Sequence, residues 1–341
     1  MNLSHSTFDS TARQFGVEQE QFVLHDNGTA PSHEEIDRLW AGLCGSGFQI
    51  HAVNNHGRVL SVARMVTQGL LVVTNDSCTH IVEVALPPYR SLTDFRRDYC
   101  ETWGLVTEQL RGLGLQLRLG GALPMPVREV HWRPKETDPE GERLYKLVHR
   151  EPLNTPLFHS AFPACFAATH ISLGVREQEA INLLAGYYSF EFLVPLWFST
   201  SPQFQSVKAH CVRPLAWEAN FHQPYPLLGI PDPLPCDLAE YELYRSQCFL
   251  RDYSFVAIRN AERLEFRSAC SQPTVEAVEQ LISFRMAIDA AVRDGVTGDW
   301  CPRTAFDDAC LGRPVAALPK ARELLGPYLD GVGLSVSSIE K

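Results

Sequence analysis

The chain has 341 residues, of which 45% are hydrophobic and 21% are charged, so it can bury a substantial core. This composition excludes disordered and fibrous proteins. The net charge of −10 and the lack of any run of Lys and Arg argue against nucleic acid as a partner. Proteins that bind nucleic acid need a basic surface to displace its counterions.

The sequence also indicates a cytoplasmic protein with no membrane partner. Residues 1–7 have neither the basic start nor the apolar run of a signal peptide, and the longest apolar run, residues 192–198, is too short to span a bilayer. The ten cysteines are scattered without a Cys-x-x-Cys motif, which favours free thiols over a disulfide framework or a zinc site.

The first predicted strand covers residues 15–24. Because successive side chains of a strand point to opposite faces, Glu18 and Glu20 share one face about 7 Å apart, whereas Val17 and Val23 lie on the other. Two neighbouring carboxylates repel each other, and a cation or water in front of them relieves the repulsion. The pattern alone leaves two interpretations open, a solvated strand face and a cation site.

The rest of the first half alternates helices and strands. The predicted elements are helices over residues 32–45 and 91–112 and strands over residues 69–74, 79–86 and 115–119. Ser32 and Glu35 have capping-box spacing at the start of the first helix. In the second strand, Glu83 is a carboxylate on an otherwise small or apolar face, and we expect Pro87 and Pro88 to end that strand.

The second half contributes three more predicted strands and four helices. The strand over residues 166–175 places His170 on the same face as Ser172 and Gly174. A hairpin of residues 253–258 and 263–268 places Glu265 and Arg267 on a common face. The predicted helices cover residues 177–198, 237–251, 273–293 and 320–329.

Two proline-rich segments, residues 124–163 and 199–235, show no clean period. Loops of that length in compact domains usually serve binding or cover a site, so we expect two long functional loops there. No internal repeat or low-complexity tract divides the sequence. We therefore predict a single domain over residues 1–341.

Four predicted strands carry ionisable side chains on one face and apolar side chains on the other. If these faces line one sheet, they bring together Glu18, Glu20, Glu83, His170, Glu265 and Arg267. Oxygen-rich ligands with a single histidine suit Mg²⁺ or Mn²⁺ better than Zn²⁺, and metals held by carboxylates usually serve phosphate chemistry. The chain has neither a P-loop motif nor a Gly-x-Gly-x-x-Gly motif, so those two nucleotide sites are unsupported.

Five segments, in this order, resemble the glutamate–cysteine ligase family of carboxylate–amine ligases, in its bacterial second type, which is related in fold to glutamine synthetase. The matching segments are residues 15–20, Asp76 with residues 81–83 and 87–88, residues 114–124, residues 169–175 and residues 264–267. Together they cover nearly the whole chain.

The resemblance implies an α+β fold in which an antiparallel β-sheet flanked by helices forms a funnel for the substrates, ATP and two or three Mg²⁺ ions, with Mn²⁺ as the alternative cation. By position it implies six metal ligands, Glu18, Glu20, Asp76, Glu83, His170 and Glu265. It also implies that Arg267 faces the transferred phosphoryl group, with Glu18 and Glu265 beside the nucleotide, and that Arg213 grips the acid substrate.

The implied reaction transfers the γ-phosphoryl group of ATP to a carboxylate, and an amine then attacks the acyl phosphate to give an amide, as in a γ-glutamyl bond. Phosphorylation supplies a leaving group, and the cations with Arg267 offset the charge on the phosphoryl oxygens. The implied enzyme is a ligase of the EC 6.3 type, unrelated to the ATP-grasp ligases. Its substrates would be glutamate and cysteine, or a specialised amino acid or peptide.

The chain departs from the family's pattern at several positions. Gln19 stands where a third acid is usual, Ser172 in place of a second histidine, Cys270 in place of an aspartate, and Leu123 in place of a histidine. The Gly- and Ser-rich segment before Arg213 is also replaced. The expected ligands of the metal are kept, whereas the changes fall on the substrate side.

Two other classes of function stay open at this point. The altered loops favour a ligase-fold module that binds a nucleotide or metabolite with reduced catalysis, and a metallohydrolase would use a carboxylate-held metal without ATP. The sequence also leaves open whether the chain forms a homo-oligomer.

Overall fold

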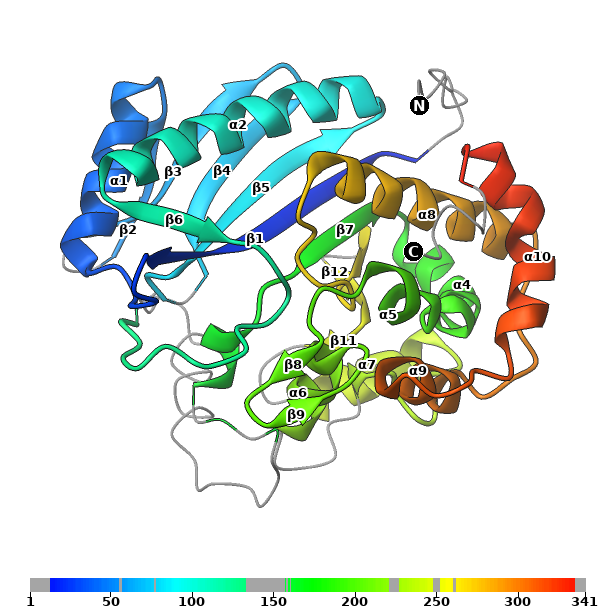
Figure 1. Ribbon diagram of the computed structural model, residues 1–341. Coiled ribbons are helices and arrows are strands. Elements are labelled where there is room, and N and C mark those ends of the chain that lie inside the picture. Colours follow the sequence, from blue (N-terminus) through cyan, green and yellow to red (C-terminus); the bar gives the residue numbers. More distant parts are fainter. Residues whose placement is uncertain are drawn as a thin grey trace.

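A nine-stranded antiparallel sheet forms the centre of the molecule (Figure 1). The computed structural model describes residues 13–54, 57–76, 78–132, 157, 159, 161–220, 227–247, 252–259 and 262–334. The sheet consists of β1 (Phe15–His25), β2 (Gln49–Val53), β3 (Val59–Val66), β4 (Gly69–Asn75), β5 (Ile81–Tyr89), β6 (Leu115–Arg118), β7 (Thr169–Gly174), β12 (Val256–Arg259) and β13 (Arg263–Phe266). Its strand order is β12-β13-β7-β1-β5-β4-β3-β2, and β6 also pairs with β1.

Helices cover one face of this sheet. The helices are α1 (His33–Gly45), α2 (Leu92–Gly112), α4 (Glu177–Phe190), α5 (Leu193–Phe198), α6 (Val212–Ala219), α7 (Leu238–Gln247), α8 (Val275–Arg293), α9 (Pro302–Leu311) and α10 (Leu318–Gly331), with a 3₁₀ turn, η1 (Phe162–Cys165). Of these, α1, α2, α4 and α8 contact the central strands, and Figure 1 shows α1 and α2 lying along the sheet. None of the helices described is both long enough and apolar enough to cross a membrane.

The two faces of the sheet differ in character. Val17 of β1 and Val84 of β5 belong to the main core beneath the helices. Because side chains alternate, the intervening Glu18, Glu20 and Glu83 lie on the opposite face, where β1 and β5 pair Glu20 directly with Glu83. The sheet therefore presents a row of carboxylates on the face away from its helices.

Two short strand pairs lie outside the main sheet. They are β8 (Gln203–Phe204) with β9 (Val207–Lys208), and β10 (Leu228–Gly229) with β11 (Tyr253–Ser254). The first pair, α6 and β10 fall in the segment over residues 199–235 that was predicted to be a loop, so that prediction is wrong for those residues. Pro214 misled it, because proline is tolerated in the first turn of a helix such as α6.

Two other boundaries differ from the sequence prediction. Strand β5 continues through Pro87 and Pro88, because β4 pairs with β5 only up to Ala85 and a missing N–H beyond that point is tolerated. The predicted helix over residues 177–198 divides into α4 and α5, since Pro195 cannot donate to the carbonyl four residues earlier.

Strands β2 and β3 and helix α9 were not predicted from the sequence. Of the predicted loop over residues 124–163, residues 133–156, 158 and 160 lie outside the described residues. The single sheet takes strands from Phe15 to Phe266 along the chain, and we keep the single-domain interpretation as a proposal.

A buried histidine ties the start of β5 to η1. His80 is fully buried, and its Nε2 lies 2.7 Å from the carbonyl oxygen of Ala164, to which it donates. Burial lowers the pKa of His80 to about 4, against a smaller opposing effect of that hydrogen bond. Between pH 6.5 and pH 4, the unfolded chain therefore takes up a proton that the folded chain refuses.

We expect acid to destabilise the protein through this group. The contribution is fully present above pH 6.5 and is lost as the pH falls, by about 2 kcal/mol at pH 5. Urea unfolding at pH 7 and pH 5 of the wild type and of His80→Asn measures it. The wild type should lose about 2 kcal/mol more than the variant, and equal losses in both proteins would contradict the assignment.

Candidate active site

The predicted site residues meet on the face of the sheet opposite α1, α2, α4 and α8. In the register, Glu18 lies opposite His170 of β7, and Glu265 of β13 lies opposite Ser172 of β7. Because β7 lies between β13 and β1, all three acidic or imidazole side chains share one face. The prediction that these strands line up with their ionisable faces together is confirmed for Glu18, Glu20, Glu83, His170 and Glu265.

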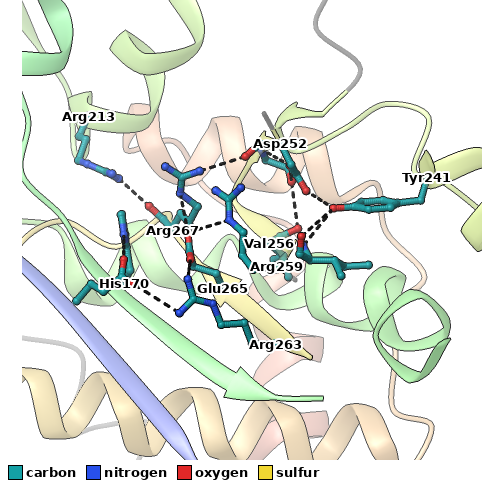
Figure 2. Close-up of polar contacts among 12 residues, drawn as sticks. His170, Arg213, Tyr241, Asp252, Val256, Arg259, Arg263, Glu265 and Arg267 are labelled. Carbon is teal, nitrogen blue, oxygen red and sulfur yellow. Dashed lines mark hydrogen bonds and ion pairs between the residues drawn. The ribbon is translucent and has the colours of Figure 1, made fainter. Parts of the chain in front are cut away.

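Glu265 lies at the centre of a group of arginines (Figure 2). Its Oε1 is 3.3 Å from Nε of Arg259 and 3.3 Å from Nε of Arg267, and its Oε2 accepts a hydrogen bond from Nη2 of Arg263 at 3.2 Å. Burial alone would raise the pKa of Glu265, but Arg267, then Arg259, His170 and Arg263, lower it to about 2. This carboxylate is therefore ionised and already compensated by positive charge.

Glu18 and His170 form a second contact on the same face. Nδ1 of His170 lies 3.6 Å from Oε2 of Glu18, and Oε1 of Glu18 lies 3.6 Å from Nη1 of Arg263. Burial raises the pKa of Glu18, but the contacts with His170 and Arg263 outweigh it, so the net shift is downward. Nε2 of His170 is buried with no hydrogen-bond partner among the described residues, which leaves this atom facing the site as a potential ligand.

Glu20 has a different environment. Its Oε2 accepts a hydrogen bond from the backbone N–H of Ala168 at 2.7 Å. Burial, followed by repulsion from Asp76, raises the pKa of Glu20 to about 7, against smaller opposing effects of His170 and Arg213. Asp76 directly follows β4, and Glu83 lies opposite Glu20 in the pairing of β1 with β5. These three carboxylates therefore form a negatively charged half of the site.

Arg213 reaches the site from α6. Its Nη1 donates to the carbonyl oxygens of Arg267 at 2.9 Å and Ser268 at 3.3 Å, and its Nε is buried with no hydrogen-bond partner among the described residues (Figure 2). The guanidinium thus holds the backbone at the end of β13. Its positive charge also lowers the pKa of Glu20 on the other side of the site, against the larger effect of burial.

Sequence reasoning missed several members of this group. Arg259 lies opposite Arg263 in the β12–β13 hairpin, so both share the face of Glu265. Arg267 also donates from Nη1 to the carbonyl oxygen of Asp252 at 3.1 Å, and the carboxylate of Asp252 accepts a hydrogen bond from the hydroxyl of Tyr241. The signal for Arg263 was present, because it precedes Glu265 by two residues as Arg267 follows it by two.

The two halves of the site differ in how well they fit a metal ion. In the part of the chain that the structure describes, no three His, Cys, Asp or Glu side chains are grouped so that they could hold a metal ion by themselves. Mg²⁺, however, is commonly bound by one or two carboxylates together with water and substrate phosphates. Glu20 and Asp76 fit that use, because a cation would relieve the repulsion that raises the pKa of Glu20. Glu18 and Glu265 do not fit it, because arginine already contacts both.

Comparisons with solved structures show which known fold this chain has. Neither a protein-family model nor a curated protein matches the sequence. Among solved structures, the bifunctional glutathione synthetase from Pasteurella multocida matches with a TM-score of 0.61 at 10% identity, over 96% of this chain and 46% of that one. Glutamate–cysteine ligase from Francisella tularensis, in complex with AMP, matches with a TM-score of 0.58 at 13% identity, over 96% and 82%.

A third match is the ligase PafA in its complex with the prokaryotic ubiquitin-like protein Pup, with a TM-score of 0.52 at 9% identity over 94% of this chain and 57% of that one. The present chain thus spans less than half the length of the Pasteurella enzyme. These matches confirm the predicted α+β fold of the glutamine synthetase-like type.

Proposed function

We propose that the chain is an ATP-dependent carboxylate–amine ligase that forms an amide through an acyl phosphate. The observation that carries this proposal is the division of one sheet face into an arginine-rich half around Glu265 and a carboxylate-rich half around Glu20. A triphosphate needs positive charge on its phosphoryl oxygens and a cation bridging its phosphates, and the two halves supply groups for both. The shared fold with known ligases supports the same class of reaction.

The arginines would contact the γ-phosphoryl group of ATP while it is transferred. Arg259 of β12 and Arg267, which follows β13, both approach Glu265 through Nε. Nη2 of Arg259 is buried with no hydrogen-bond partner among the described residues. Fixed guanidinium groups stabilise charge that develops in a transition state, because they need no reorientation as the reaction proceeds. We assign Arg267 as the principal phosphoryl contact and Arg213 to the acid substrate, whose carboxylate its charge would attract.

The carboxylate-rich half would hold the cation. Glu20 and Asp76 would bind it together with water and the phosphates of ATP, and Glu83 and Nε2 of His170 would adjoin the bound ion. Such an oxygen-rich environment suits Mg²⁺ or Mn²⁺. When bound, such a cation offsets the charge of the phosphate oxygens and allows an anionic acid to approach ATP.

The nine cysteines described are all free thiols, which agrees with the cytoplasmic location that we propose.

The acid and the amine are the open part of this proposal. Candidate acids are glutamate and other amino acids with a free carboxylate, and candidate amines are cysteine, other amino acids and small peptides. The three matched ligases act in quite different settings, from glutamate–cysteine ligase to a ligase in complex with the protein Pup, so the fold itself does not choose among these substrates.

The proposal is tested by ADP release. Purified protein is incubated with Mg-ATP and a panel of amino acids and peptides as acids, each with a panel of amines, and ADP is measured. We expect ADP only when an acid is present, and amide only when ATP is present. Amide or hydrolysis product formed without a nucleotide would indicate a metallohydrolase. Binding of Mg-ATP by calorimetry without ADP in any combination would indicate a binding module.

A further inference from the structure

Arg263 occupies an unusual position between two acidic strands. It lies on β13, with its guanidinium 3.2 Å from Oε2 of Glu265 on the same strand and 3.6 Å from Oε1 of Glu18 on β1. Strand β7 lies between β13 and β1, so one guanidinium spans a whole strand and joins two carboxylates that do not share a strand pairing. A cation held between two strands would make the same pair of contacts.

Small residues on β7 leave room for this bridge. Arg263 lies opposite Gly174, and Glu265 lies opposite Ser172, so the strand under the guanidinium carries no large side chain at either position. On the other side of β7, Ser172 pairs with Gly16 of β1, and a Cβ added to Gly16 would lie 3.7 Å from Cβ of Ser172.

The negative charge of this half is already more than compensated. Two carboxylates, Glu18 and Glu265, face three guanidinium groups, those of Arg259, Arg263 and Arg267. A divalent cation entering between Glu18 and Glu265 would have to displace the guanidinium of Arg263 from both carboxylates. The carboxylate of Glu265, with 5% of its side chain exposed, has little water to replace that contact.

We propose that Arg263 takes the place of one divalent cation in this site, so that a guanidinium instead of a metal joins Glu18 to Glu265. The site then holds one cation fewer than its carboxylates could support, and its cations are confined to the half formed by Glu20, Asp76 and Glu83. This inference rests on the proposed function in treating the face as a nucleotide site, but it concerns the number of bound cations and not turnover.

The experiment counts bound Mn²⁺ by electron paramagnetic resonance at saturating concentrations of a non-hydrolysable ATP analogue. The wild type is compared with Arg263→Ala, in which the space between Glu18 and Glu265 is open to a cation. We expect the variant to bind one Mn²⁺ per chain more than the wild type. The Arg263 side chain is 41% exposed, so its removal should leave the fold intact.

Two variants serve as matched controls. Arg263→Lys keeps a positive charge at the same position, and Arg259→Ala removes an arginine that contacts Glu265 but has no contact with Glu18 in the structure. Both should keep the count of the wild type. A gain of one Mn²⁺ in Arg259→Ala as well would show that charge alone decides the count and would overturn the bridging role.

Equal counts in the wild type and Arg263→Ala would also overturn the inference. Should Arg263→Ala fail to fold, Glu18→Gln provides a second test, because Glu18 in this account binds no metal and its variant should keep the count of the wild type. A loss of one Mn²⁺ in Glu18→Gln would contradict the inference. A wild type that binds no Mn²⁺ with the analogue would instead contradict the proposed function, and a gain in Arg263→Ala would still support the bridge.

Discussion

Replacing Arg267 with methionine is expected to slow ADP formation by about a hundredfold to a thousandfold and to leave the fold intact. Removing one fixed donor to a charged transition state typically has that effect on the rate. Glu265 would keep its contacts with Arg259 and Arg263, so the buried carboxylate stays compensated in the variant. The measurement is the rate of ADP formation at saturating ATP, with circular dichroism as the test of folding.

The control for this variant is an arginine of the surface. Arg245 on α7 has 46% of its side chain exposed and forms an ion pair with Glu242 on the same helix, so Arg245→Met should keep the rate of the wild type. The rate of ADP formation in Arg267→Lys should lie between those of the wild type and Arg267→Met. Lysine keeps the charge but cannot reach both Glu265 and the carbonyl oxygen of Asp252 in the same geometry. A folded Arg267→Met that keeps the wild-type rate would remove Arg267 from phosphoryl transfer.

The largest loss of stability is expected from Arg285→Met on α8. Arg285 and Glu191 are both fully buried and form a two-pronged ion pair, with Nη1 to Oε2 at 2.7 Å and Nη2 to Oε1 at 2.8 Å. The same guanidinium lies over the ring of Phe266 at 4.4 Å, and the hydroxyl of Ser268 donates to Glu191. The pair therefore holds α8 and the break between α4 and α5 against the end of β13.

Breaking a buried ion pair by removing one partner leaves an uncompensated charge and costs about 3–5 kcal/mol. Urea unfolding at neutral pH should show that loss for Arg285→Met, a large share of the roughly 5–15 kcal/mol that a folded protein usually has. The double variant Glu191→Gln with Arg285→Met removes both charges and should recover most of it. A loss below about 1 kcal/mol in the single variant would mean that the pair is not buried in solution.

The local sequence pattern was sufficient to predict many of the helices and strands, and on which face of a strand each side chain lies. The capping box of Ser32 and Glu35 is formed as predicted, and alternation assigned Glu18 and Glu20 to the same face of β1. These features depend on neighbours within a few residues, so the sequence contains the information directly. Prolines were less reliable, because Pro88 lies in a strand and Pro214 in a helix, each at a position where a missing N–H does no harm.

The pairing of distant strands could not be obtained in this way. That Glu265 lies opposite Ser172, and Glu18 opposite His170, depends on the order β13-β7-β1, which is set by packing over the whole chain. The resemblance drawn from the sequence implied six metal ligands without distinguishing among them. The structure separates a group with Glu20 and Asp76, which repel each other, from a group in which Arg263 joins Glu18 to Glu265.

The central claim, that this face activates a carboxylate with ATP, is tested most directly by trapping the acyl phosphate with hydroxylamine. Hydroxylamine replaces the unknown amine, so the panel needs to contain acids only, and mass spectrometry identifies the acid that is converted. We expect a hydroxamate of at least one acid, dependent on Mg-ATP and formed in equal amount with ADP and phosphate. ADP released at the same rate with and without every acid, and without hydroxamate, would contradict the claim.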